Sequence, residues 1–357
     1  MTAVLHPRPN PIVAAMYTLR DLDVDVIIIH GPSGCGFMAS RMLEEAGVRV
    51  VTTSMNEKDL IFGAYESMRE VLERVEDLFG PSRVGVVGTC ASMIIGEDLN
   101  PFRGMIDAEL ILVDVHGCMG DNTTGAIRAM EAAEHVGIID GYELNRQKLL
   151  LEAATTMERD FGMASKGYIR PTRGPTKHSM ACRIIQTLEA GGSVDVIMNA
   201  KKELAYRFAD INLAIEEASR TLGGDVRHVM NVDPSGGLPR IRRYAEDILS
   251  RISSEGLEPI MTGALDEYAV TGDKLEDILN ERNSDLRIFT GIPHAYMGLR
   301  SDDLVVTDQP RILAGLLDRG FQAVGEIASH SMVMGARDII PSETGDTIRE
   351  LIESRVG

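Results

Sequence analysis

The chain has 357 residues, 44% of them hydrophobic and 25% charged, which is typical of a globular protein with two or three α/β domains. Its formal net charge of −18 argues against general nucleic-acid binding, because an acidic surface repels phosphates. No apolar run approaches the roughly 20 residues that cross a bilayer, and the N-terminal segment lacks a signal-peptide pattern, so we expect a cytoplasmic protein without a membrane partner.

The first 140 residues alternate between short apolar runs and helical patterns. The runs that we expect to form strands are 24–30, 48–53, 83–89 and 108–115, and the expected helices are 35–47, 57–79 and 123–137. Short continuous apolar runs are typical of strands buried on both faces of a parallel sheet. Their alternation with helices predicts a doubly wound sheet.

The rest of the chain repeats this alternation after a basic interruption. Residues 142–162 are expected to be helical, and the stretch 165–179 is rich in Pro, Gly and positive charge, without any acidic residue. Further strands are expected at 194–200, 226–232, 257–263, 286–291, 303–308 and 321–327, with helices between them and at 342–355. The sequence therefore predicts an α/β protein of two or three Rossmann-like domains with parallel sheets. We place the domains at 1–165, 166–260 and 261–357.

Three of the four cysteines follow expected strands. Cys35 comes five residues after strand 24–30, Cys90 directly after strand 83–89, and Cys118 three residues after strand 108–115, whereas Cys182 has no such position. Ligands of open α/β sheets bind beyond the carboxyl ends of the strands, so we expect Cys35 and Cys90 to share a functional role. The alternative is that these thiols are buried and inert, as most free cysteines are.

The glycine-rich stretch around Cys35, IIIHGPSGCGFMAS (27–40), is not a phosphate-binding loop. It lacks the Lys and Ser/Thr of GxxxxGK[ST], and it does not contain GxGxxG. A cysteine at the start of a helix is expected to have a lowered pKa and to be a thiolate, which is the form that ligates iron–sulfur clusters. Cys35 and Cys90 supply two of four cluster ligands, and a two-fold dimer would supply all four.

Four segments within roughly the first 135 residues resemble, in the same order, segments of the nitrogenase component 1 superfamily, which includes the dark-operative protochlorophyllide reductases. They are IIIHGPSGCGF (27–37), TTSMNEKDLIFGAYESMRE (52–70), GVVGTCASMIIGEDL (85–99) and VDVHGCMGDNTTGAIRAM (113–130). The resemblance implies that Cys35 and Cys90 ligate a cluster. This chain has no cysteine before Cys35 and none after Cys182, which favours a single 4Fe-4S cluster and disfavours nitrogen fixation.

Within the superfamily, the short chain and the HGCMGDN variant (116–122) are most similar to the catalytic subunits of methanogen Ni-sirohydrochlorin a,c-diamide reductive cyclases. That resemblance implies a homodimer with a bridging 4Fe-4S cluster and a nickel tetrapyrrole substrate. The implied reaction is a multi-electron reduction coupled to lactam ring closure, giving the seco precursor of coenzyme F-430 in methanogenesis. A separate ATP-hydrolysing reductase, similar to the nitrogenase iron protein, would supply electrons, in line with the missing phosphate-binding loop.

Three alternatives to this function stay open. They are a nitrogenase-like reductase of another tetrapyrrole, a non-catalytic scaffold that binds a cluster or tetrapyrrole, and an α/β ligand-binding protein with inert cysteines.

The sequence also suggests proton donors and substrate-binding residues. Candidate donors on the strand-end loops are His116, Cys118, Asp121 and Asp98, although a cap or turn contact is the favoured interpretation of each of the two aspartates. The basic stretch contributes Arg170, Arg173, Lys177 and His178, which suit the carboxylates of a tetrapyrrole. A solvated linker is the alternative for that stretch.

Overall fold

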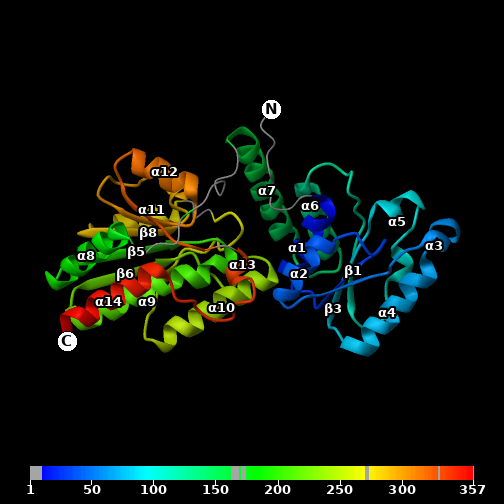
Figure 1. Ribbon diagram of the computed structural model, residues 1–357, viewed down its shortest axis with the longest axis horizontal. Helices are drawn as coiled ribbons and strands as arrows, with labels where there is room; N and C mark the ends of the chain where they lie inside the picture. The colour runs from blue at the N-terminus through cyan, green and yellow to red at the C-terminus, as the bar shows by residue number, and fades with distance from the viewer. Residues whose placement is uncertain (1–9, 162–168, 170–173, 270–272, 329, 357) are drawn as a thin grey trace. The chain divides into compact units, whose positions relative to one another are not determined.

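The computed structural model describes residues 10–161, 169, 174–269, 273–328 and 330–356. The chain divides into two compact units (Figure 1). The first comprises the residues up to Phe161 together with Leu238–Arg240, and the second comprises the remaining residues. Within the described residues, no helix is both long and apolar enough to cross a membrane. Both units contain a parallel sheet flanked by helices, which confirms the predicted α/β class.

The first unit is built on a four-stranded parallel sheet in the order β2-β1-β3-β4. Its strands are β1 (Val26–Ile29), β2 (Arg49–Thr52), β3 (Arg83–Val87) and β4 (Glu109–Val113), each inside an expected run. Its helices are α1 (Pro11–Asp21), α2 (Phe37–Glu45), α3 (Glu57–Phe62), α4 (Tyr65–Phe79), α5 (Cys90–Ile94), α6 (Asn122–His135) and α7 (Gly141–Phe161), with a 3-10 turn η1 at Asn100–Phe102.

Apolar side chains fill both faces of this sheet. On one face, Val26 and Ile28 of β1 pack with Met68 and Leu72 of α4 and with Phe102 of η1. On the other face, α1 packs against β3 and α6. Leu19 of α1 sits where a side chain at Gly85 would stand, since a Cβ there would lie 2.6 Å from Leu19 Cδ1. A strand buried on both faces explains the continuous apolar runs in the sequence.

Three local features of this unit differ from the sequence-based expectation. The expected helix 57–79 is two helices, because Gly63 adopts φ +92° between α3 and α4. The break is closed by the Ala64 N–H, which donates to Glu97 Oε2 at 3.0 Å. Helix α1 lies in a segment to which the sequence assigned no element, and α5 lies where a loop was expected.

The second unit is built on a six-stranded parallel sheet in the order β10-β9-β8-β5-β6-β7. Its strands are β5 (Ser193–Asn199), β6 (Asp225–Met230), β7 (Ile260–Met261), β8 (Leu286–Gly291), β9 (Leu304–Thr307) and β10 (Gln322–Gly325). Its helices are α8 (Pro175–Glu189), α9 (Ala205–Leu222), α10 (Pro239–Ser254), α11 (Lys274–Asn280), α12 (Pro310–Asp318), α13 (His330–Val333) and α14 (Glu343–Val356).

Strands on both sides of the expected boundary at residue 260 belong to this one sheet. Strand β8 pairs with β5, so the chain after residue 260 returns to the centre of the sheet. Ile197 and Val229, from before the boundary, share a core with Phe289 and Val305, from after it. The structure therefore has one unit where the sequence suggested separate domains at 166–260 and 261–357.

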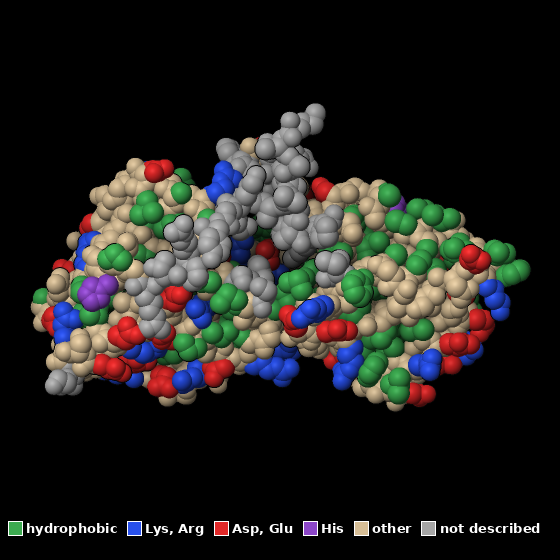
Figure 2. Space-filling view, in the orientation of Figure 1, with side chains coloured by type: hydrophobic (Ala, Val, Ile, Leu, Met, Phe, Trp, Pro, Cys, Tyr) green, Lys and Arg blue, Asp and Glu red, His purple; other side chains and the backbone are tan. Residues whose placement is uncertain are grey.

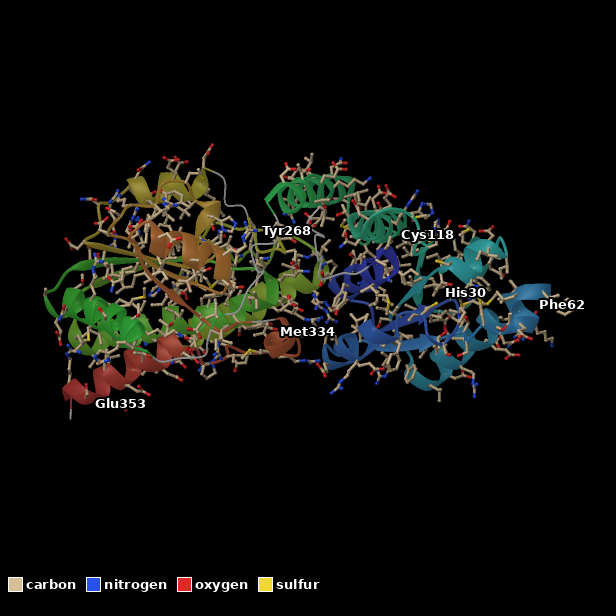
Figure 3. All side chains as sticks on the ribbon, turned by 45° about the horizontal axis from the view of Figure 1, so that its top comes forward. His30, Phe62, Cys118, Tyr268, Met334 and Glu353 are labelled. Carbon is tan, nitrogen blue, oxygen red and sulfur yellow. The ribbon has the colours of Figure 1, made fainter. Side chains whose placement is uncertain are left out.

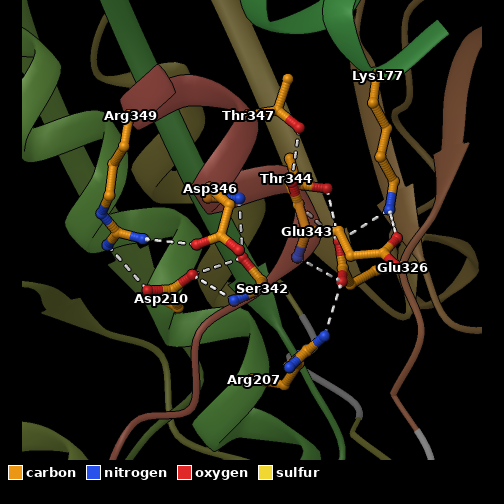
Figure 4. A network of polar contacts seen from close by, with 11 residues as sticks. Lys177, Arg207, Asp210, Glu326, Ser342, Glu343, Thr344, Asp346, Thr347 and Arg349 are labelled. Atoms are coloured by element: carbon orange, nitrogen blue, oxygen red, sulfur yellow. Dashed lines mark hydrogen bonds and ion pairs between the residues drawn. The ribbon is translucent and has the colours of Figure 1, made fainter. Parts of the chain in front are cut away.

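A buried ionic network joins three helices of the second unit to the end of β10 (Figure 4). Glu326, which is fully buried, accepts hydrogen bonds from the Thr344 hydroxyl and backbone N–H at the start of α14, at 2.6 and 3.1 Å. Lys177 of α8 lies with its Nζ 3.4 Å from Glu326 and 2.6 Å from Glu343. Arg207 of α9 lies 3.5 Å from Glu326. The carboxylate thus stabilises the α14 N-terminus and is neutralised by two cations.

Candidate functional site

Cys35 and Cys90 follow the two strands at which the first sheet changes direction. From β1 the chain builds outward to β2 on one side, then returns to place β3 on the other side. Ligands of open α/β sheets bind in the crevice at such a switch point, beyond the carboxyl ends of the strands. The loop after β1 carries Cys35, and Cys90 begins the short helix after β3. The expectation that both cysteines occupy this edge agrees with the structure.

The loops at this edge are tied together around Gly31. The Thr89 hydroxyl donates to the carbonyl oxygen of His30 at 2.9 Å, which joins the segments after β3 and β1. The Gly31 N–H donates to Thr53 Oγ1, and the Thr52 hydroxyl donates to Gly31 O, each at 3.0 Å. A Cβ at Gly31 would collide with the Thr89 side chain. The edge is therefore rigidly built before any ligand arrives.

The partly buried Cys35 lies in a tight turn, where its N–H donates to Pro32 O at 3.0 Å. Burial raises the pKa of the Cys35 thiol, and the neighbouring Cys90 raises it further. The sequence-based expectation of a lowered pKa at Cys35 is therefore wrong for the protein without a metal. Helix α2 begins only at Phe37, behind Gly36 at φ +79°, so Cys35 precedes the helix and burial dominates. A bound metal ion reverses this effect, because its charge favours the thiolate.

Cys90 has a hydrogen-bond donor aimed at its sulfur. The backbone N–H of Gly117 donates to Cys90 Sγ at 3.2 Å, and the Cys90 side chain is partly buried. Gly117 belongs to the loop 114–121 that follows β4, so a third strand end contributes to the site. Among the residues described, no group of three or more His, Cys, Asp and Glu side chains is placed to hold a metal ion. Cys35 and Cys90 are thus the two partly buried thiols at this edge, and the exposed Cys118 follows Gly117 in the loop after β4.

His30, which directly follows β1, is fully buried in the first unit (Figure 3). Its Nδ1 lies 3.3 Å from Thr53 Oγ1, and its ring meets the Phe102 ring edge-on at 6.3 Å. Burial lowers the pKa of His30 to about 4, against a smaller opposing effect of Asp59. The imidazole is therefore neutral at physiological pH.

The four candidate proton donors divide into two kinds. Asp98 accepts hydrogen bonds from the backbone and side-chain amides of Asn100, and Asp121 accepts the Thr124 N–H at 3.2 Å as the N-cap of α6. Both aspartates therefore have the cap and turn contacts that the sequence offered as their alternative. His116 is half-buried, and Cys118 is exposed (Figure 3). His116 and Cys118, both in the loop after β4, are therefore the candidate proton donors that remain near the site.

The basic stretch offers fewer ligand-binding groups than its sequence suggested. Lys177 is buried and ion-paired with Glu326 and Glu343, so its charge is already neutralised. His178 is exposed on α8. Arg170 and Arg173 lie outside the described residues.

Large hydrophobic side chains are exposed on the helices that follow the strand ends, and the sequence patterns did not predict them. Phe37 of α2 is 72% exposed, Phe62 of α3 79% and Ile94 of α5 74%, and these helices follow the ends of β1, β2 and β3. Figure 2 shows hydrophobic side chains gathered over α3 and α5. We call this surface the apolar edge patch, and it consists of Phe37, Leu60, Ile61, Phe62, Met93 and Ile94. The sequence does not predict the part of the patch on α3, because residues 57–79 have the pattern of one amphipathic helix.

Comparisons with known proteins agree on one family. Residues 11–137 match the family model described as nitrogenase component 1 type oxidoreductase. The component CfbD of the Ni-sirohydrochlorin a,c-diamide reductive cyclase complex is 45% identical in Methanothermobacter thermautotrophicus and 43% identical in Methanosarcina acetivorans. Each alignment covers 98% of this chain, and 99% and 97% of the respective relatives.

More distant relatives are similar only in part. The nitrogenase molybdenum-iron protein beta chain of Methanococcus maripaludis is 30% identical over 34% of this chain and 27% of its own length. A solved structure of nitrogenase Cp1 at pH 5 aligns with 99% of this chain and 89% of that chain, at 13% identity and a TM-score of 0.35. That likeness is too distant to support an argument about this chain.

Proposed function

The chain belongs to the family of the CfbD component of Ni-sirohydrochlorin a,c-diamide reductive cyclases, and from this premise we propose that it is the catalytic subunit of such a cyclase. The proposed reaction reduces Ni-sirohydrochlorin a,c-diamide by several electrons and closes an amide side chain into a lactam ring. The observation that carries the proposal is the position of Cys35 and Cys90 at the switch point of a chain that matches these relatives over 98% of its length.

The donor set of this edge fits an iron–sulfur cluster. Thiolates are the usual ligands of such clusters, and the Gly117 N–H at Cys90 Sγ is the kind of hydrogen bond that stabilises a ligating sulfur. When bound, a 4Fe-4S cluster supplies one-electron transfer. A cubane needs four thiolates, and Cys35 and Cys90 are the two partly buried cysteines of this edge, whereas Cys118 is exposed. We therefore assign Cys35 and Cys90 of two copies to one shared cluster.

The apolar edge patch supports a homodimer at this place. Large hydrophobic side chains exposed around a site are typical of protein–protein interfaces. Ile94 shares helix α5 with Cys90, Phe37 follows Cys35 by two residues, and Ile61 and Phe62 lie on α3 after β2. A second copy that covered these side chains would also bring its own thiols. The symmetric use of one surface is the property of a two-fold interface.

Electrons would come from a separate ATP-hydrolysing reductase similar to the nitrogenase iron protein. The sequence contains no GxxxxGK[ST] motif, so nucleotide-driven electron delivery falls to a partner. Within this chain, His116 and Cys118 remain the proposed proton donors beside the cysteine edge, and Arg170, Arg173 and His178 the proposed contacts to substrate carboxylates.

An anaerobic turnover assay tests this function. The protein is mixed with the reductase partner, ATP, a reductant and Ni-sirohydrochlorin a,c-diamide, and the tetrapyrrole products are separated and weighed by mass spectrometry. We expect lactam product from the wild type and from Cys182→Ser, a control on α8, and none from Cys35→Ser or Cys90→Ser. A wild-type protein that carries its cluster and accepts electrons but leaves this substrate unchanged would contradict the proposal, and the same assay with other tetrapyrroles would then identify a related reductase.

A further inference from the structure

The Gly117–Cys90 hydrogen bond depends on the absence of a side chain at residue 117. A Cβ built on Gly117 would lie 3.2 Å from Cys90 Sγ, which is the same distance at which the Gly117 N–H now donates. Carbon at that distance crowds sulfur, so a side chain would push the loop and its N–H away. The glycine therefore permits this approach of backbone to sulfur, whereas a Cβ here would force the loop or the Cys90 side chain to shift by a few tenths of an ångström.

The loop that carries Gly117 is held in place at three points. At its base, Gly88 packs against the backbone of Val115, since a Cβ on Gly88 would lie 3.1 Å from Val115 O. Within the loop, the Met119 N–H donates to His116 O at 3.2 Å. At its end, Asp121 caps α6. The N–H is thus presented to the sulfur by a fixed backbone, which costs little reorganisation when the charge on the sulfur changes.

We propose that Gly117 is a positioning residue that sets the reduction potential of the cluster through its N–H bond to Cys90 Sγ, an inference that rests on the proposed cluster function. Reduction adds negative charge, part of which falls on the ligating sulfurs. An N–H donor stabilises the reduced state more than the oxidised state, and hydrogen bonds to sulfur are a main determinant of cluster potentials. The bond therefore makes the cluster easier to reduce by its partner.

The size of the effect follows from the worth of one hydrogen bond. Loss of one such bond is expected to shift the reduction equilibrium about threefold to tenfold toward the oxidised cluster, and a substitution present in both copies removes two such bonds from the shared cluster. For a one-electron couple, a tenfold change corresponds to about 59 mV. A shift of that order is measurable by redox titration.

The test compares midpoint potentials of the reconstituted full-length protein, followed by electron paramagnetic resonance. Gly117→Ala should lower the potential, because the added methyl group lengthens the N–H to sulfur contact. Gly141→Ala is the matched control, since the same methyl group at the start of α7 meets nothing within 4 Å. Gly88→Ala displaces the same loop in a second way, because its Cβ crowds the Val115 backbone. If Gly117→Ala holds no cluster, the potential of Gly88→Ala tests the role of the Gly117 N–H instead.

The outcomes separate this inference from the function on which it rests. A lower potential in Gly117→Ala, or in Gly88→Ala where Gly117→Ala holds no cluster, supports the role of Gly117 if Gly141→Ala is unchanged. Equal potentials in all four proteins would overturn it while leaving the cluster and the proposed function intact. A wild-type protein that binds no cluster after reconstitution would instead contradict the proposed function itself.

Discussion

The buried His30 makes the stability of this protein depend on pH in a defined range. Burial lowers the pKa of His30 from 6.5 to about 4. Between these two pH values, His30 is protonated in the unfolded chain but stays neutral in the folded chain. The contribution of His30 is therefore fully present above pH 6.5 and is lost progressively as the pH falls toward 4. At roughly 1.4 kcal/mol per pH unit, the whole interval corresponds to about 3 kcal/mol, of which about 2 kcal/mol is lost between pH 7 and pH 5.

Urea unfolding followed by circular dichroism at pH 7 and pH 5 measures this effect. His30→Asn keeps an amide near the position of Nδ1, beside Thr53, but does not titrate. We expect the variant to be less stable at pH 7, and its deficit in free energy of unfolding to shrink by about 2 kcal/mol at pH 5. His135→Asn, at an exposed site on α6, is the control and should follow the wild type. An unchanged deficit in His30→Asn at the two pH values would refute the reasoning.

Three further perturbations test other parts of the structure. Gly31→Ala places a Cβ against the Thr89 side chain and should cost about 1–3 kcal/mol of stability in thermal unfolding. A variant as stable as the wild type would show that the loops after β1 and β3 do not pack closely at Gly31. Phe62→Asp should shift the sedimenting species from dimer to monomer with little loss of stability. Leu78 is exposed on α4 outside the apolar edge patch, so Leu78→Asp should stay a dimer. Equal dimerisation of both variants would reject the patch as the interface. Glu326→Gln removes the buried carboxylate that Lys177 and Arg207 share, although Lys177 keeps Glu343, and it should cost about 3 kcal/mol in urea unfolding. A cost below about 1 kcal/mol, the value typical of an exposed ion pair, would contradict the burial of this network.

The strands could be predicted from the sequence because burial on both faces leaves a direct pattern. Residues 26–29 of the expected run 24–30 are all apolar and form β1, and residues 84–87 of the run 83–89 are only Val and Gly and form most of β3. The position of Cys35 and Cys90 followed from the same pattern, since the end of a parallel strand fixes the edge of the sheet. Helix boundaries were harder to predict from the sequence. The break at Gly63 depends on a backbone angle and on the hydrogen bond from the Ala64 N–H to Glu97, which lies 33 residues away in the chain.

Features that depend on contacts between distant segments could not be predicted. The sequence placed Lys177 in a basic stretch, but its partners Glu326 and Glu343 come from the other end of the chain. The helix-start argument for a lowered Cys35 pKa ignored burial, which the sequence does not reveal. The hydrogen bond from Gly117 to Cys90 likewise joins two strand ends, and only the folded sheet brings them together.

The central claim is that two copies of the chain share one cluster through Cys35 and Cys90, and iron content measured together with native mass tests it most directly. For the protein reconstituted anaerobically, we predict a dimer with about two irons per chain, that is, one 4Fe-4S cluster per dimer. Cys35→Ser and Cys90→Ser should each lose the iron, and Cys182→Ser should keep it. A monomer that holds about four irons, or a Cys90→Ser protein with undiminished iron, would contradict the account.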